Sequence, residues 1–337
     1  MKQFIAKSLK YLILLLIGIV LLYFAFKEQD LNLLLEDLRR AEYVWVFASV
    51  LFAYFAHLLR AYRWRMMISS LGHGTPSVIN TFYAVLIGYL ANLAFPRMGE
   101  VSRCGVINKT DQIPIVKLIG TVVAERLIDL LMLGFIIFLA IAIQFGLLSD
   151  FLYNNLLIKL TGSEGYFTLL VFVSCLLILM LVLFYIFKKR EKLGIWYKIH
   201  NFYLDIISGI FSIKAMGNKA GFIAYSILIW LMYGISVYLC FFALKATAEL
   251  GPVVALSTLV FSSLAMIAPV QGGIGAFHWM VSEGLTIYGI ERSEGLAFAL
   301  LLHSFQTLII LFTGSISLIL LFINSPKKIG NEEAGTN

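Results

Sequence analysis

Two short stretches decide how this chain folds. Residues 92–103 read Asn-Leu-Ala-Phe-Pro-Arg-Met-Gly-Glu-Val-Ser-Arg, and residues 268–275 read Ala-Pro-Val-Gln-Gly-Gly-Ile-Gly. Each contains the pattern Pro-x-x-Gly, which begins at Pro96 and at Pro269, and a helical run precedes and follows each pattern. Proline interrupts a helix, and membrane helices tolerate such interruptions. The pattern therefore predicts two broken helical hairpins.

The composition around these stretches is that of a membrane protein. Of 337 residues, 61% are hydrophobic and 13% are charged, about half the charge that a soluble domain carries. The apolar residues form blocks of about 19 to 28 residues, long enough to cross a bilayer as helices. Strands of a β-barrel would instead alternate polar and apolar residues over about ten positions. We predict an all-α polytopic membrane protein and exclude a soluble fold.

The apolar blocks predict about six full spans in addition to the two hairpins, or eight or more membrane segments. The hairpins cover 78–109 and 252–290. Residues 1–325 are predicted to form one transmembrane domain, and residues 326–337 a disordered tail. The halves of this domain are about 1–150 and 166–325. The predicted full spans are 11–26, 43–59, 113–145, 166–187, 222–244 and 296–323.

Basic loops give the orientation, because short cytoplasmic loops are enriched in Lys and Arg. The N-terminus, residues 60–65, the loop 188–220 and the C-terminus are basic, so both termini are predicted to be cytoplasmic in a bacterial inner membrane. The loop 188–220 holds seven Lys or Arg against two acids, a net charge of +5, and its apolar residues recur at helical spacing. We expect an amphipathic helix on an anionic membrane surface.

This orientation makes the two hairpins enter from opposite faces. Each half then consists of a span, a broken hairpin and a second span, which is the pattern of an inverted repeat whose breaks meet near the midplane. The alternative is two unrelated Pro-Gly helix ends.

Charged residues cluster after the first break. Arg97, Glu100 and Arg103 follow one another at three-residue steps, which would place them on one helix face. The planar guanidinium group suits phosphate, and Gly99 permits close approach of a ligand or a helix. The alternative is an interfacial charge cluster that water satisfies.

A second cluster, Glu125, Arg126 and Asp129, lies within the predicted span 113–145. Charged groups at membrane depth are costly and face protein or a wet cavity. We expect this cluster to bind a substrate, and the alternative is a structural ion pair with Arg97 or Arg103.

The second break offers backbone N–H groups. A helix that starts there would present its positive N-terminal end to a phosphate, and its glycines would permit close approach, although close helix packing also explains glycines. His303 and Gln306 lie three residues apart on the last span and either line the same cavity or bond between helices. The candidate binding residues here are Gln271, Gly272, Gly273, Gly275 and His278.

Together these motifs, with Arg60-x-x-Arg63-Trp64, resemble the lysylphosphatidylglycerol synthase transmembrane-region family, also called flippase-like domain proteins. The resemblance covers roughly residues 10–325 and implies lipid movement across the membrane. The aminoacyl-transfer domain of bifunctional relatives is absent from this sequence, so we expect no enzyme activity. Many relatives have Pro-Gly-Gly at the second break and an acid where His278 stands, which puts lysyl lipid in doubt as the substrate.

The resulting hypothesis is a lipid translocase that binds an anionic or zwitterionic phospholipid, or a lipid-linked headgroup, in a midplane cavity. We predict no catalytic residue, metal, cofactor or nucleic-acid partner, because no Gly-x-x-x-x-Gly-Lys-Ser/Thr loop or His-rich metal set occurs. A transporter of a soluble anion, a membrane enzyme acting on a polyprenyl phosphate and a purely structural protein are the alternatives. The lipid, the direction, the driving ion and any homo-oligomer stay open.

Overall fold

The computed structural model describes residues 19–20, 23, 31–145, 216–268 and 270–324. Outside these residues lie most of the predicted span 11–26, the span 166–187, nearly all of the loop 188–220, Pro269 and the tail 326–337. Within the described ranges every regular element is a helix, which confirms the all-α prediction for this part of the chain.

Four long apolar helices are each able to cross a membrane by length and composition. Three of them match the predicted spans closely. The helix predicted at 43–59 extends ten residues further, to Ser69, and Arg60 and Arg63 therefore lie inside a helix and not in a cytoplasmic loop. The four helices are α3 (Tyr43–Ser69), α6 (Ile115–Ile143), α11 (Lys219–Phe241) and α14 (Arg292–Asn324).

Two helical hairpins lie between these helices, at the predicted places. The first hairpin consists of α4 (Val78–Ala94) and α5 (Met98–Asp111), and the second consists of α12 (Pro252–Ala265) and α13 (Ala276–Thr286). A short 3-10 helix, η3 (Gln271–Gly273), lies at the second break. In each hairpin the two helices pack against each other.

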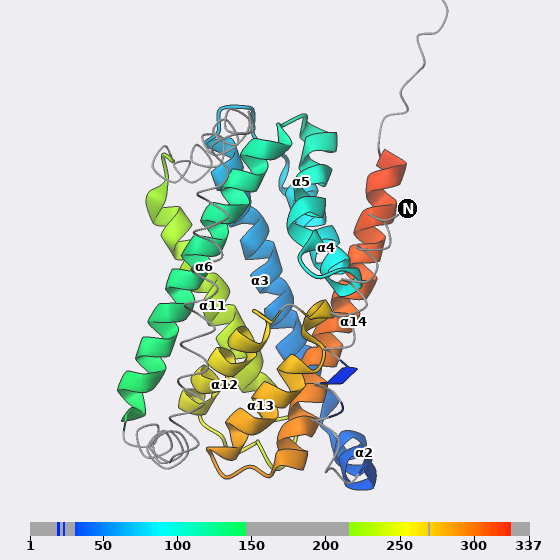
Figure 1. Cartoon of the computed structure of the whole chain (residues 1–337), viewed down its shortest axis with the longest axis vertical. Helices are drawn as coiled ribbons and strands as arrows, with labels where there is room; N and C mark the ends of the chain where they lie inside the picture. The colour runs from blue at the N-terminus through cyan, green and yellow to red at the C-terminus, as the bar shows by residue number, and fades with distance from the viewer. Residues whose placement is uncertain (1–18, 21–22, 24–30, 146–215, 269, 325–337) are drawn as a thin grey trace, which may run out of the picture.

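The two hairpins point toward each other. In Figure 1 the first hairpin occupies the upper half of the molecule and the second hairpin the lower half, and their broken ends lie near the middle. The ends are in contact, because α4 packs against η3. A Cβ atom added at Gly272 would lie 2.9 Å from Leu93 Cδ2. Residues about 180 positions apart in the chain are thus neighbours.

The packing of the first half has a counterpart in the second. Helix α3 packs against α4 as α11 packs against α12, and α5 against α6 as α13 against α14. Across the halves, α14 packs on α4 as α6 packs on α12, and α3 and α11 lie along each other. A short helix that the sequence analysis did not predict, α2 (Leu31–Arg40), packs on α14 and buries Leu34.

Candidate functional site

Helix α3 places two arginines in the interior of the upper half. Arg60 and Arg63 are three residues apart and therefore lie on one face of the helix, and only 5% of Arg60 and 0% of Arg63 is exposed. They lie about 14 Å and 9 Å before the end of α3 at the usual helical rise. The face that carries them packs toward α6 and α11.

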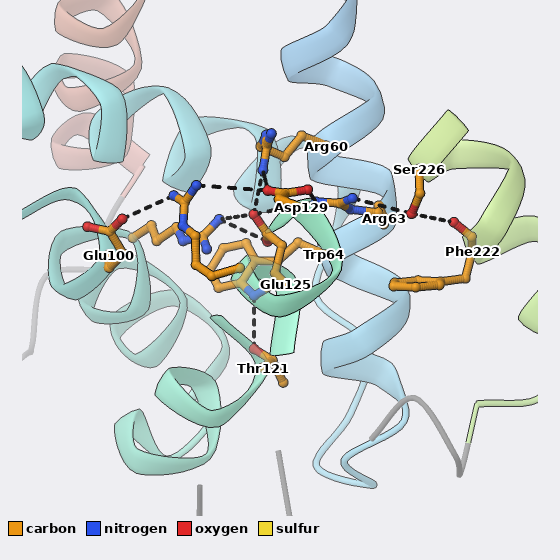
Figure 2. A network of polar contacts seen from close by, with 11 residues as sticks. Arg60, Arg63, Trp64, Glu100, Thr121, Glu125, Asp129, Phe222 and Ser226 are labelled. Atoms are coloured by element: carbon orange, nitrogen blue, oxygen red, sulfur yellow. Dashed lines mark hydrogen bonds and ion pairs between the residues drawn. The ribbon is translucent and has the colours of Figure 1, made fainter. Parts of the chain in front are cut away.

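Two carboxylates of α6 meet these arginines, one helical turn apart (Figure 2). Arg60 Nη1 lies 2.8 Å from Glu125 Oε1 and 2.6 Å from Asp129 Oδ2. Arg63 Nη2 lies 2.7 Å from Asp129 Oδ1, and Arg63 Nη1 donates to Ser226 Oγ of α11 at 3.3 Å. Because each ion has several partners, the interior accommodates charges that would be costly alone.

Helix α5 adds a third buried guanidinium group, which contacts Glu125. Arg103 Nη1 lies 3.1 Å from Glu125 Oε2, and its guanidinium carbon lies 4.6 Å from the centre of the Trp64 ring. The Trp64 indole in turn donates to Thr121 Oγ1 at 2.9 Å (Figure 2). The cation–π contact and this hydrogen bond fix the direction of the Arg103 side chain.

The remaining ion pair joins α5 and α6 at the rim. Arg126 Nη2 lies 3.1 Å from Glu100 Oε1, with 45% and 30% of the two side chains exposed. A small pocket lies beside it, between α4, α5 and α6. The residues that line the pocket are Val85, Gly88, Tyr89, Asn92, Gly99, Glu100, Arg103 and Arg126.

We call these seven charged residues the arginine–carboxylate network: four guanidinium groups, of Arg60, Arg63, Arg103 and Arg126, and three carboxylates, of Glu100, Glu125 and Asp129. Their formal charges sum to +1. Several buried polar atoms of the network have no hydrogen-bond partner among the described residues, namely Arg60 Nε, Arg63 Nε, Arg103 Nε, Arg103 Nη2 and Glu100 Oε2. Positive surplus and unused donors are the properties of a site for an anion.

The structure separates the residues that the sequence placed on one face after the first break. Arg97 precedes the helix with a left-handed backbone (φ 62°), its side chain is exposed, and no hydrogen bond or ion pair of this side chain occurs within the described residues. Arg103, by contrast, is buried. Gly99 is used for helix packing, because it faces Gly88 of α4 and its N–H donates to Asn92 Oδ1 at 2.7 Å.

At the second break most of the predicted amide donors are used within the protein. The N–H of Gly275 donates to His278 Nδ1 at 3.3 Å, and the N–H groups of Gly273 and Ile274 donate to carbonyls of the same turn. His303 Nε2 lies 2.8 Å from the Gly272 carbonyl oxygen, so His303 bonds between helices. Gln271 is half-buried beside them. These residues lie together, but they do not form an open cradle of N–H groups.

Sequence reasoning did not assign a binding role to Arg60 and Arg63, which are two of the three buried guanidinium groups of the network. A run of arginines after an apolar block is typical of a membrane boundary, so the span was predicted to end at residue 59, whereas α3 continues to Ser69 and buries both arginines. Their three-residue spacing beside Trp64 was the available signal, since it places both arginines on one helix face. The carboxylates that pair with them lie more than 60 positions away in the chain.

Comparison with known proteins identifies one family. The model of the family described as "Lysylphosphatidylglycerol synthase TM region" matches residues 11–314. No curated protein and no solved structure matches the chain.

Proposed function

The chain belongs to the lysylphosphatidylglycerol synthase transmembrane-region family, and from this premise we propose that it is a lipid translocase. The family and the four long apolar helices make it a multi-pass membrane protein with a function related to membrane lipids. In our proposal it passes the headgroup of a phospholipid, or of a lipid-linked substrate, across the bilayer while the tails stay in the lipid. The chain itself performs no covalent chemistry in this proposal.

The architecture proposed for this function is an inverted repeat with two re-entrant hairpins. The matching helix contacts of the two halves support it, and so do the opposed directions of the hairpins in Figure 1. Paired broken helices that meet near the midplane are a common site for transported substrates. The contact between Leu93 and Gly272 marks the place where the hairpins meet.

One observation carries the proposal more than any other: the exposed Arg97 at the end of the first hairpin. Arg97 lies at the broken end of the hairpin, and a helix of the length of α5 places it about 20 Å from the other end of α5, at Asp111. That distance corresponds to a position near the middle of a bilayer. A charge at that depth needs a partner or a water-filled cavity. Since Arg97 makes no ion pair with the described residues, we propose that a headgroup phosphate is its partner.

The arginine–carboxylate network has a different part in the proposal. Its buried arginines hold three helices together and keep a positive potential behind the pocket, and the exposed Arg97 receives the phosphate as the headgroup moves toward the second break. A soluble anion could use the same charges, so transport of a soluble anion is the alternative that we retain.

The test is lipid transfer in proteoliposomes that contain phosphatidylglycerol with a fluorescent tail. An impermeant reductant bleaches the outer leaflet, and the bleaching of inner-leaflet lipid then reports transfer. We expect Arg97→Ala to lower transfer about tenfold or more, the loss for a hydrogen bond to a charged group, without a change in melting temperature. Arg97→Lys should restore only part of the rate because it lacks the planar fork.

The matched control is Arg39→Ala, which removes an exposed arginine from α2. If Arg97→Ala and Arg39→Ala both transfer lipid at the parent rate, Arg97 does not bind the phosphate. Uptake of radiolabelled inorganic phosphate into the same proteoliposomes, without lipid transfer, would instead support the soluble-anion alternative.

A further inference from the structure

The Glu100–Arg126 ion pair lies on a largely apolar surface, with the exposed Arg97 three residues before Glu100. Its neighbours along α5 and α6 are exposed hydrophobic side chains: Met98 is 37% exposed, Val101 53%, Leu127 47% and Leu130 59%. Such a surface on a helical membrane protein faces lipid tails. A half-exposed ion pair in that position is unusual, because both ions lose much of their hydration there.

The space behind the ion pair is lined by both polar and apolar groups. Glu100 and Arg126 both line the pocket between α4, α5 and α6, and Arg103 lines it from the interior. Arg103 is only 4% exposed, and its Nη2 atom has no hydrogen-bond partner. Thus a single ion pair separates an unused buried donor from the apolar surface.

The Glu100–Arg126 ion pair has few other contacts, so another anion could replace Glu100 as the partner of Arg126. Arg126 reaches Asp129 only at 3.9 Å, and Glu100 uses one carboxylate oxygen for Arg126 while Oε2 has no partner. Glu125, by comparison, is contacted by three arginines. An anion that took the place of Glu100 would leave the inner part of the network intact.

We propose that the Glu100–Arg126 pair is a lateral gate, and that a phospholipid enters the pocket from the bilayer between α5 and α6. The phosphate of the entering lipid replaces the Glu100 carboxylate on Arg126 and then reaches Arg103 Nη2, while its tails stay against the exposed side chains of Val101, Leu127 and Leu130. This gate deepens the proposed lipid translocation and rests on it.

The observations favour a lipid as the occupant over a free anion. The arginine–carboxylate network has a surplus charge of +1, which suits one phosphate diester. A lipid headgroup and a free phosphate ion would both neutralise this charge. Only the lipid also covers the apolar rim with its tails. Free phosphate would reach the pocket from water, and the rim would then contribute nothing to binding.

The experiment measures which lipids approach the gate. The photoreactive residue benzoylphenylalanine replaces Leu127 in one variant and Leu308 in a control variant; Leu308 is a similarly exposed residue of α14 (55%). Each variant is reconstituted into vesicles with a traceable phosphatidylglycerol or with diacylglycerol of the same tails. We expect phosphatidylglycerol to label position 127 in preference to diacylglycerol, and both lipids to label position 308 equally.

Variants of the ion pair then test the gate itself, with Leu127 replaced throughout. Arg126→Gln should lower the preference for phosphatidylglycerol about tenfold or more, as expected for the loss of a charge-assisted hydrogen bond. Glu100→Gln should raise the labelling, because Arg126 then lacks its internal partner. Glu283→Gln, which breaks the 2.8 Å ion pair of Glu283 with Arg292 between α13 and α14, should leave the preference unchanged.

Three outcomes would overturn the gate. Equal preference at positions 127 and 308, while the parent protein still transfers lipid, would place the entrance elsewhere and leave the proposed function standing. If phosphatidylglycerol and diacylglycerol label position 127 equally in every variant, the pocket does not bind an anion. Protection of position 127 by excess inorganic phosphate, with no preference between the two lipids, would show that the pocket takes a soluble anion. A melting curve of each variant separates these outcomes from misfolding.

Discussion

At Glu125, three arginines from two other helices meet one fully buried carboxylate. Removal of one partner from a buried ion network leaves uncompensated charge and costs about 3–5 kcal/mol. We therefore expect Glu125→Gln to lower the stability of the protein by that amount, seen as a large drop in melting temperature in detergent. The exposed Glu249→Gln serves as the control and should change little. A drop of less than about 1 kcal/mol, the scale of a surface ion pair, would contradict the structural role of Glu125.

The two hairpins give a prediction at the scale of helical elements. A Cβ atom at Gly272 would lie 3.9 Å from the Cα atom of Leu93, so cysteine side chains at these two positions would lie close together. In a chain without its native cysteines, Leu93→Cys combined with Gly272→Cys should crosslink on mild oxidation, detected as a shift in non-reducing gel mobility. Each single variant is the control. Absence of the crosslink in folded protein would mean that the hairpins do not meet.

The sequence predicted these hairpins but not the full course of α3, and the reason is the range of the interactions. Pro96 and the glycines of the second break act on the backbone locally, so the chain alone indicates where helices stop. The charge of Arg60 can be buried within α3 because Glu125 and Asp129 neutralise it, and these residues come from another element. The exposed Arg97 and the buried Arg103 likewise differ through their tertiary surroundings, which helical spacing does not contain.

Among the residues that the structure describes, the two ends of the molecule differ in charge. Helices α3 and α5 finish at one end of the molecule, where α6 and α11 begin. This end carries mainly basic residues, and the opposite end carries mainly acidic residues. Basic ends are cytoplasmic by the positive-inside rule. The basic end has Arg65, Lys109, Lys117 and Lys219 against Asp111, and the acidic end has Glu36, Asp37, Glu42, Glu249, Glu283, Glu291 and Glu294 against Arg39, Arg40, Lys245 and Arg292.

If the protein lies in a bacterial inner membrane, as we expect from the sequence, this asymmetry predicts its orientation there. An impermeant thiol reagent added to intact cells whose outer membrane has been permeabilised should label a cysteine at Glu249, and a cysteine at Lys109 should react only after the inner membrane is opened. Both positions are exposed, so burial does not protect either of them. Labelling of Lys109 from outside, with Glu249 protected, would mean that the protein is inserted the other way round.

Helix α14 touches both hairpins, and this has a consequence for how the molecule moves. His303 holds the carbonyl of Gly272 in the second hairpin, and Gly314, whose added Cβ would lie 2.9 Å from Leu90 Cβ, lets α14 lie close against the first. The two attachment points are about 16 Å apart on one continuous helix, which behaves as a stiff rod over that length. We therefore expect a displacement of either hairpin to be passed to the other through α14, so that the two hairpins move together. Such coupling would disfavour opening toward both sides of the membrane at once, which would leak ions.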